Sequence, residues 1–429
     1  MPAGVLSGIR VLEFSQIVAA PVAGVNLADF GADVVKVEPP GGEQTRRMGS
    51  VVPSESKGFQ ALNRGKRSLV IDLHDERGQA VMRRLIAQTD VVLINYRYGV
   101  AERMGIDYET LCKIRPDLIY WQNTGFGEQG PEVSRAGSDI VAQAYSGLMV
   151  TDAKVDDDGA PDLISVPISD IVSGFAAAMA VGMALFHREK TGEGQYLSTS
   201  LLRTALFLQA ASVMREPVSD AVLRDPMMER SRAAIEGGAS YPEVLQARQS
   251  GQAARLAFRL YYGGYRAQGG AVVLGALTKT NRNSMREVLG FTDEDSDSPD
   301  YDALDPENQR RAIEWKRRFR ERFMERSVEE WVHDFDAAGV PVSAVRQPEE
   351  LADDPQVVAD GMMWDVEHTV TGLQRVVGPA VVMSKTPTAV QRSAPALGEH
   401  SAQVLVEGGF APEEIARLCE EGVLVQRLA

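Results

Sequence analysis

The amino-acid sequence predicts a soluble α/β protein with a parallel sheet, and two observations carry this prediction. The chain has 429 residues, of which 44% are hydrophobic, enough for a sizeable core and for two domains. Short apolar runs also alternate with helical patterns between residues 9 and 122. Such alternation is typical of parallel sheets, whose ligands lie beyond the carboxyl ends of the strands.

The predicted elements of this region follow a strand-helix-strand order. We expect strands at 9–14, 33–38, 90–94 and 118–122, and helices at 20–30, 79–88 and 108–114. Pro21 falls in the first turn of its helix, where proline is tolerated. Ligand-binding residues are expected directly after the strands, at Ser15 and Gln16, Glu38, Asn95 and Tyr96, and Asn123 and Thr124.

A long helix is expected to begin near Ile171. Its segment 172–186 consists almost entirely of small or apolar residues, which predicts burial on most sides. After this helix we expect a glycine turn at 191–195, an alternating segment at 195–200 and a helix at 201–214. A linker with a helix is expected at 218–252. A second unit should begin at about Leu260 with two short strands, followed by charged helices at 309–327 and 328–338, and the last hundred residues return to α/β character.

Asp170 lies where an extended run, residues 164–168, meets this long helix. A helix N-terminus carries about half a positive charge and unpaired N–H groups, which favour an ionised acid. A half-buried carboxylate in that position is suited to act as a nucleophile. The alternative is that Asp170, or Ser169 before it, only caps the helix.

Composition and charge argue against several classes of protein. A formal net charge of -15 disfavours binding to nucleic acid or to an anionic membrane. We find no stretch of about 20 apolar residues and no signal peptide at the start, so we expect a cytoplasmic protein. Cys112 and Cys419 are interpreted as buried thiols, and the scattered histidines predict no metal site.

Basic residues in the predicted loops could hold a phosphate-bearing ligand: Arg46, Arg47, Arg64, Lys66, Arg67, Arg97, Arg103 and Arg135. The alternative is that they are solvated surface charges. Arg97 and Arg103 are favoured because they flank the carboxyl end of a predicted strand.

The glycine fingerprint of dinucleotide-binding proteins is missing between residues 15 and 21. Its absence argues against a nicotinamide site, although Glu38 ends the second strand, where a ribose-binding acid would lie. No nucleophilic serine in a G-x-S-x-G turn is present either.

Several segments, taken together and in order, resemble the family III CoA-transferases, the group of carnitine, formyl-CoA and bile-acid CoA-transferases and the related α-methylacyl-CoA racemases. The resemblance runs nearly end to end. Its segments are LADFGADVVKVEPPGG (27–42), NRGKRSLVIDL (63–73), GFGEQGP (125–131), QAYSGLM (143–149), SDIVSG (169–174), TGEGQ (191–195) and PALGEH (395–400).

The resemblance implies a Rossmann-like large domain made from both chain ends, a smaller α+β middle domain and an interlocked homodimer. It assigns residues 1–205 to the CoA-binding large domain, 206–255 to a linker with a helix, 256–345 to the middle domain, and 346–429 to a linker and the C-terminal part of the large domain.

The same resemblance implies an activity and a site. Asp170 corresponds to the family's catalytic aspartate, which would take CoA from an acyl-CoA to a free carboxylic acid through a mixed anhydride and an aspartyl-CoA thioester. Acyl-CoA and a small carboxylic acid are the implied partners, with no tightly bound cofactor. The implied CoA-binding residues are Gln16, Val18, Ala19, Pro39, His74, Asn95, Tyr96, Arg97, Arg103, Met104 and Arg135. Gly237-Gly238 and Gly263-Gly264 are candidates for a loop that stabilises an oxyanion.

Two departures from the family pattern bear on the reaction. The usual Glu-Asn-Phe-x-Pro-Gly turn is Ile94-Asn95-Tyr96-Arg97-Tyr98-Gly99 here, without the acid and the proline. The racemases' Gly-His-Asp motif is Gly137-Ser138-Asp139, and a serine cannot act as the second base at neutral pH. This favours CoA transfer over the alternatives, which are an α-methylacyl-CoA racemase or epimerase and a non-catalytic acyl-CoA-binding protein.

Overall fold

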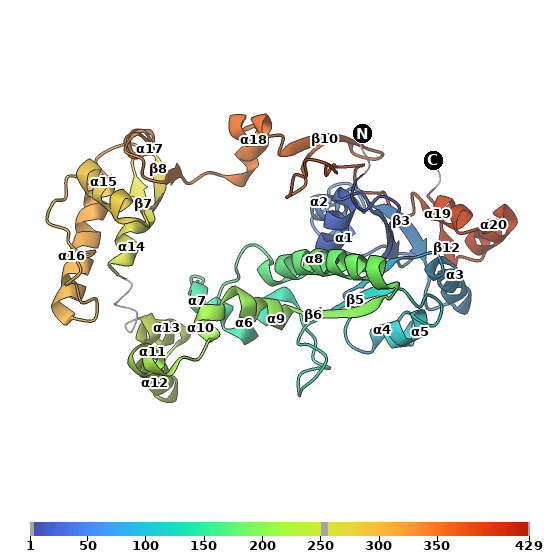
Figure 1. The fold of residues 1–429 in the computed structure, drawn as a ribbon, viewed down its shortest axis with the longest axis horizontal. Coiled ribbons are helices and arrows are strands. Elements are labelled where there is room, and N and C mark those ends of the chain that lie inside the picture. Colours follow the sequence, from blue (N-terminus) through green and yellow to red (C-terminus); the bar gives the residue numbers. More distant parts are fainter. Residues whose placement is uncertain (1–3, 250–255, 428–429) are drawn as a thin grey trace. The chain divides into compact units, whose positions relative to one another are not determined.

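The computed structural model describes residues 4–249 and 256–427, which fall into two compact units (Figure 1). The first unit comprises Met1–Lys154, Asp162–Val213 and Ala352–Ala429, and the second comprises Val155–Pro161 and Met214–Leu351. The sequence analysis assigned 155–161 to the large domain and 206–213 to a linker, whereas the structure groups them with the second and the first unit, respectively. Residues 250–255 of the expected linker lie outside the described residues.

A seven-stranded sheet forms the centre of the first unit. Its strands are β1 (Arg10–Phe14), β2 (Asp33–Glu38), β3 (Arg67–Ile71), β4 (Val91–Ile94), β5 (Ile119–Thr124), β6 (Gln195–Ser200) and β12 (Leu424–Val425). Their order is β12-β3-β2-β1-β4-β5-β6, and all neighbours are parallel except β12 and β3. The order reverses direction between β1 and β4, and open α/β sheets bind ligands at such a point.

Helices cover both faces of this sheet. The helices of the first unit are α1 (Ala19–Asp29), α2 (Lys57–Asn63), α3 (Glu76–Ile86), α4 (Val100–Arg103), α5 (Tyr108–Leu111), α6 (Asp139–Ser146), α7 (Leu148–Asp152), α8 (Ile168–Thr191), α9 (Leu201–Leu208), α10 (Ala210–Val213), α18 (Pro355–Ala359), α19 (Ser401–Glu407) and α20 (Pro412–Glu420), with a 3₁₀ turn η1 at Gln44–Arg47. Successive strand residues point to opposite faces, so Val11 packs with α1 and α8, whereas Leu12 packs with α3, α19 and α20.

The described strands and helices confirm most of the predicted order up to residue 122. The sequence analysis missed β3, α2 and the hairpin of β10 (Met363–His368) and β11 (Gly372–Val377). The expected helix 201–214 is wrong as a single element, because it is divided at Gln209 into α9 and α10.

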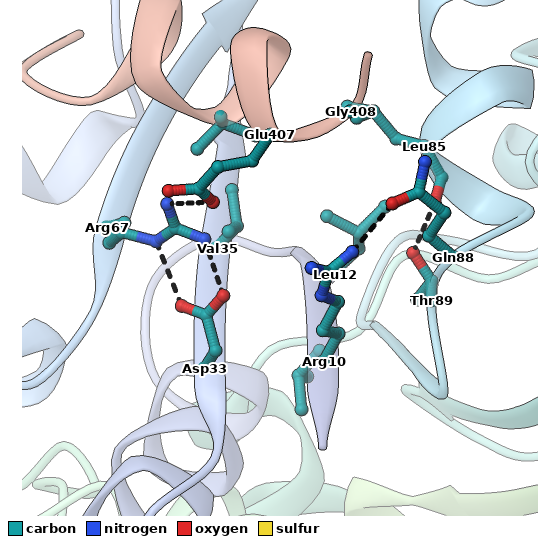
Figure 2. Close-up of a pocket in the computed structure, with 12 residues that line it drawn as sticks. Arg10, Leu12, Asp33, Val35, Arg67, Leu85, Gln88, Thr89, Glu407 and Gly408 are labelled. Atoms are coloured by element: carbon teal, nitrogen blue, oxygen red, sulfur yellow. Dashed lines mark hydrogen bonds and ion pairs between the residues drawn. The ribbon is translucent and has the colours of Figure 1, made fainter. Parts of the chain in front are cut away.

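The C-terminal part of the chain completes the sheet. β12 pairs with the outer edge of β3, and Ser401 Oγ accepts a hydrogen bond of 3.1 Å from Val70 N–H. At the amino ends of the strands, Arg67 bridges Asp33 (Nε to Oδ1, 2.9 Å) and Glu407 (Nη1 to Oε2, 2.8 Å), beside a cavity of about 40 Å³ (Figure 2). Arg67 therefore connects the N-terminal part of the sheet to Glu407, which lies 340 positions later in the chain.

Four members of the basic group named above are structural, so their interpretation as loop residues that bind phosphate is wrong. Arg46, with no exposed side-chain surface, makes a bidentate ion pair with Glu38 (both N–O distances 2.7 Å), which also removes Glu38 as a ribose ligand. Lys66 Nζ lies 2.7 Å from Glu13 Oε2, and both side chains are fully buried. Arg64 pairs with Asp29, and Arg67 forms the bridge described above.

Helix α8 differs from its prediction in three ways. It begins at Ile168, three residues earlier than expected, and Phe175, Met179, Met183 and Phe186 are 44–66% exposed, so it is not buried on most sides within this chain. By length and composition, with a mean hydropathy of 1.7, it is long enough to cross a membrane, contrary to the expected absence of such a stretch. Its other face nonetheless packs on α1 and the sheet through Ala177, Val181 and Ala184, as in the core helix of a globular unit.

The second unit is built around a three-stranded antiparallel sheet, β7-β8-β9. Its elements are α11 (Pro217–Ser219), a π-helical turn η2 (Asp220–Arg224), α12 (Asp225–Glu236), α13 (Tyr241–Gln249), α14 (Phe258–Tyr261), β7 (Tyr262–Ala267), β8 (Gly270–Gly275), α15 (Lys279–Leu289), α16 (Pro306–Phe323), α17 (Val328–Ala337) and β9 (Val342–Ala344). Segment 214–249 is therefore mainly helical, not a linker with one helix. Aromatic side chains fill the core, with Phe323 stacked between Tyr265 and Phe335.

Two arginine variants test the weight of these ion pairs. Arg46→Met leaves Glu38 buried without its bidentate cation, and we expect it to lower the free energy of unfolding by about 3–5 kcal/mol. Arg67→Met should lower it by only about 1–3 kcal/mol, because its partners Asp33 and Glu407 are 39% and 41% exposed and water can solvate them. Urea unfolding measures both values, and an equal or larger loss for Arg67→Met would contradict this reading.

Candidate active site

A cavity of about 530 Å³ lies at the point where the strand order reverses. Its walls are the loops after β1, β4 and β5 and the first turns of α6 and α8. The lining residues used below are Gln16, Ile17, Val18, Asn95, Tyr96, Arg97, Asn123, Arg135, Ser138, Asp139 and Asp170. The carboxyl ends of three neighbouring strands thus meet one buried acid, as the sequence analysis expected for the ligand-binding edge.

Asn95 ties together the two strands that flank this point. Its Oδ1 accepts a hydrogen bond of 3.1 Å from Gln16 N–H, and its Nδ2 donates one of 2.8 Å to Gln16 O. An amide side chain offers both a donor and an acceptor, so asparagine copies the pairing that another strand residue would supply. The loop after β1 is therefore held against the loop after β4.

Asp170 is the third residue of α8 and is 9% exposed. It does not cap its own helix. Asp139 performs that role from the start of α6: its Oδ1 accepts hydrogen bonds from Ser169 N–H (2.8 Å) and Asp170 N–H (3.2 Å). The unpaired N–H groups of α8 thus stabilise the Asp139 carboxylate and leave the Asp170 side chain free.

Burial, and then the nearby charge of Asp139, raise the pKa of Asp170 to about 7, although a hydrogen bond from the backbone N–H of Ala19 acts in the opposite direction. The sequence analysis expected the N-terminus of α8 to favour the ionised form of Asp170. That expectation is wrong, because desolvation and the like charge of Asp139 raise the pKa of Asp170 by more than the helix dipole lowers it. The result is a carboxyl group that gains or loses its proton near neutral pH.

Close backbone contacts bring these groups together. A Cβ atom on Gly174, one helical turn after Asp170, would lie 2.5 Å from Val22 Cβ and 2.6 Å from Ala19 O. Only glycine allows α8 to approach α1 this closely, and the approach brings Ala19 to Asp170. Likewise, a Cβ atom on Gly137 would lie 2.5 Å from Gly125 Cα, so the loops before α6 and after β5 cross in backbone contact.

Ile17 has a left-handed backbone with φ of 69°. A left-handed β-branched residue costs about 1–2 kcal/mol. Its N–H donates a hydrogen bond of 2.8 Å to Glu43 Oε2. A hydrogen bond to a charged group contributes about 1.5–3 kcal/mol, enough to offset the backbone strain.

The structure divides the implied CoA-binding residues into two groups. Gln16, Val18, Asn95, Tyr96, Arg97 and Arg135 line the cavity with Asp170, and Ala19 reaches Asp170 through its N–H group. Pro39, His74, Arg103 and Met104 do not line it: Pro39, His74 and Arg103 are exposed after β2, after β3 and at the end of α4, and Met104 packs partly buried on the core. CoA binding by either group stays a prediction.

Two residues of the site, Asp139 and Glu43, were missed in the sequence. Asp139 was mentioned only as the last residue of the Gly137-Ser138-Asp139 motif, and Glu43 lies one residue beyond the segment 27–42. Asn123, by contrast, was expected at this edge of the sheet; it is 4% exposed at the end of β5, and its side-chain oxygen has no hydrogen-bond partner in the described part of the chain. The three glycines Gly125, Gly137 and Gly174 were a signal that could have been read as close backbone approach.

The structure also places the glycine pairs and the cysteines named in the sequence. Gly263 and Gly264 lie within β7 and so form part of a strand, not a loop, while Gly237 and Gly238 follow α12. Cys112 and Cys419 are only partly buried. Among residues 4–249 and 256–427, no group of three or more His, Cys, Asp or Glu residues is placed to hold a metal ion.

Two alanine substitutions on the same helix test the α1–α8 contact. Gly174→Ala inserts a methyl group where there is no space, and we expect it to lower the free energy of unfolding by about 1–3 kcal/mol. Gly182→Ala is the matched control, because nothing lies within 4 Å of its Cβ position, and it should raise stability by about 0.5–1 kcal/mol. If both substitutions changed the free energy of unfolding in urea by the same amount, the close contact at Gly174 would not determine the stability of this packing.

Comparison with known proteins identifies the chain. The family model for CoA-transferase family III matches residues 6–401. The chain is 30% identical over 425 residues to human succinyl-CoA:glutarate CoA-transferase, covering 98% of this chain and 90% of that protein. It is 29% identical over 424 residues to succinyl-CoA:mesaconate CoA-transferase of Haloarcula hispanica, covering 95% and 97%. The crystal structure of a CaiB/BaiF family protein from Brucella suis superposes with a TM-score of 0.70 at 27% identity, covering 95% of this chain and all of that one. A single match spanning nearly the whole chain, together with relatives of this kind, shows that the protein belongs to CoA-transferase family III.

Proposed function

We propose that this enzyme moves CoA from an acyl-CoA to a carboxylic acid with Asp170 as the nucleophile. The observation that carries the proposal is the position of Asp170: it is nearly buried, faces a cavity large enough for part of a CoA thioester, and makes no ion pair with any described residue. A carboxylate of this kind is poorly solvated and therefore reactive toward a carbonyl carbon.

The proposed reaction consists of four balanced exchanges. An Asp170 carboxylate oxygen attacks the thioester carbonyl, and the CoA thiolate leaves as the mixed anhydride forms. The thiolate then attacks the aspartyl carbonyl, which releases the first acid and leaves an aspartyl-CoA thioester. The acceptor carboxylate attacks that thioester, and the expelled thiolate attacks the new acyl group, which restores Asp170. No proton is gained or lost overall, so a site without a histidine base suffices.

The groups around Asp170 support distinct roles in these steps. The backbone N–H of Ala19 acts on the Asp170 carboxylate in the direction that lowers its pKa, which favours the ionised nucleophile. Arg97 lies at the cavity wall without an ion-pair partner among the described residues, and the half-exposed Arg135 forms an ion pair with Glu132. We assign both guanidinium groups to phosphate or carboxylate groups of the substrates.

We infer that the acids exchanged are short dicarboxylic acids. The relatives reported above are named for succinyl-CoA with glutarate and with mesaconate, which share two carboxyl groups on a short carbon chain. One carboxylate would react with Asp170 while the other requires a cationic partner, and Arg97 and Arg135 are the arginines that line the cavity.

A racemase or epimerase is the second candidate, and Ser138 in place of a histidine counts against it because inversion needs a base on each side of the carbon. Exchange of the α-hydrogen for deuterium in D₂O without an acceptor acid would favour it. A non-catalytic acyl-CoA-binding protein would bind CoA and show no turnover with any acid.

We further propose that the first unit is the CoA-binding domain and that two chains form an interlocked homodimer, as the resemblance implies. The exposed apolar stripe of Phe175, Met179, Met183 and Phe186 on α8 supports an association of this kind. We retain the cytoplasm as the proposed location, without binding to nucleic acid or membrane.

Trapping the proposed intermediate tests the nucleophile. With succinyl-CoA and a panel of short mono- and dicarboxylic acids, we expect transfer to dicarboxylic acids, read by mass spectrometry of the acyl-CoA products. Hydroxylamine added during turnover should leave a hydroxamate at Asp170. Asp170→Asn, which keeps the shape of the side chain, should lower kcat by several orders of magnitude. Full activity of Asp170→Asn, or a hydroxamate at another residue, would contradict the mechanism.

The raised pKa of Asp170 predicts the pH dependence. Because the ionised form is the nucleophile, kcat/KM for the acyl-CoA should rise with pH, with the midpoint of the rise near pH 7. Asp139→Asn removes the like charge that contributes to the raised pKa, so the midpoint of the rise should move to lower pH. A midpoint that is the same in the two proteins would show that Asp139 does not act on Asp170.

A further inference from the structure

Three successive residues of the loop between β1 and α1 are each held by a different partner. Lys36 Nζ donates a hydrogen bond to Ser15 Oγ (2.8 Å), the Asn95 side chain forms hydrogen bonds with both the N–H and the C=O of Gln16, and the N–H of Ile17 donates to Glu43. Gln16, Ile17 and Val18 line the same cavity as Asp170, and Ala19, which follows them, packs against α8 at Gly174. The conformation at Ile17 therefore sets the shape of the cavity wall next to Asp170.

Glu43 is itself held rigidly. It is 4% exposed, its Oε1 lies 3.2 Å from the buried Lys36 Nζ, and its N–H donates a hydrogen bond of 3.1 Å to Glu38 Oε2. Glu38 is fixed in turn by the bidentate pair with Arg46. A chain of buried charges thus connects the core of the sheet to a single strained residue at the cavity wall.

We propose that Glu43 is a positioning residue for CoA transfer, which holds Ile17 in its left-handed conformation and thereby fixes the cavity wall that residues 16–18 form beside Asp170. This inference rests on the proposed function of Asp170 and deepens it. Glu43 touches neither the substrate nor the reacting atoms of the proposed mechanism. It acts through the backbone of residues 16–18.

The choice of residue at position 17 makes the inference specific. Isoleucine is among the residues least suited to a positive φ, so without an acceptor for its N–H group the loop would turn toward ordinary φ values. Glycine populates positive and negative φ about equally and would need no such support. The dependence of turnover on Glu43 should therefore vary with the residue at position 17.

A double-mutant cycle measures this dependence. Four proteins are compared in the succinyl-CoA transfer assay: wild type, Glu43→Ala, Ile17→Gly and the double variant. We expect Glu43→Ala to lower kcat about 5- to 30-fold, the factor that corresponds to losing the support of a strained residue. In the Ile17→Gly background the same substitution should lower kcat about twofold or less.

Readouts besides kcat separate positioning from simple stabilisation. Unfolding in urea reports stability, and KM for succinyl-CoA reports binding. Asp29→Asn is the control: Asp29 is a buried carboxylate at the other end of α1, paired with Arg64, and should lower stability while leaving kcat unchanged. If Glu43→Ala does not fold, Glu43→Gln, which keeps the volume and weakens the acceptor, replaces it in the cycle.

Each result decides between the two ideas. Equal losses of kcat in both backgrounds, or lower stability at unchanged kcat, would overturn the role of Glu43 while leaving the role of Asp170 intact. No transfer by the wild type to any acid in the panel would overturn the proposed function and this inference together. If Glu43→Ala lowers kcat less in the Ile17→Gly variant than in the wild type, and the stabilities are matched, the result supports both the role of Glu43 and the role of Asp170.

Discussion

The close packing of α1 against α8 at Gly174 is the contact on which the site depends. Without a Cβ atom at this position, the two helices approach until Val22 and the carbonyl oxygen of Ala19 occupy the space that a side chain would need. The first turns of both helices then meet at one edge of the sheet, where the strand order reverses. Asp170 and the loop after β1 come together through this contact, because one belongs to α8 and the other leads into α1; the loops after β4 and β5 and the first turn of α6 complete the cavity.

Two carboxylates, Asp139 and Asp170, lie at the start of α8 in different environments. Asp139 accepts hydrogen bonds from the free N–H groups at the start of α8, whereas Asp170, although it belongs to that helix, has a poorly solvated position. The helix dipole therefore acts on Asp139, while desolvation raises the pKa of Asp170. A second set of buried charges, from Glu13 and Lys36 to Glu43, supports the opposite wall of the cavity.

Much of this arrangement could be predicted from the sequence, because local signals determine it. Apolar periodicity located β1, β2, β4 and β5 but not β3, and the position of Asp170 beside a long apolar helix, with the family segments, selected the central acid. Contacts between distant segments could not be read in the same way. Arg46, Arg64 and Lys66 look like loop cations until Glu38, Asp29 and Glu13 are found beside them in the fold. The left-handed conformation of Ile17 carries no sequence signal at all, since isoleucine is not a residue that favours it.

The pairing of β3 with β12 has a consequence for how the chain is made. Ribosomes synthesise β3 more than three hundred residues before β12, and Arg67 is made 340 residues before its partner Glu407. Throughout that interval the nascent chain presents an open strand edge, with Leu69 and Ile71 lacking the cover of α19 and α20. Unpaired edges are where growing chains associate wrongly. The second unit lies between the two halves of the first in sequence, so its length sets how long the sheet stays unfinished during translation.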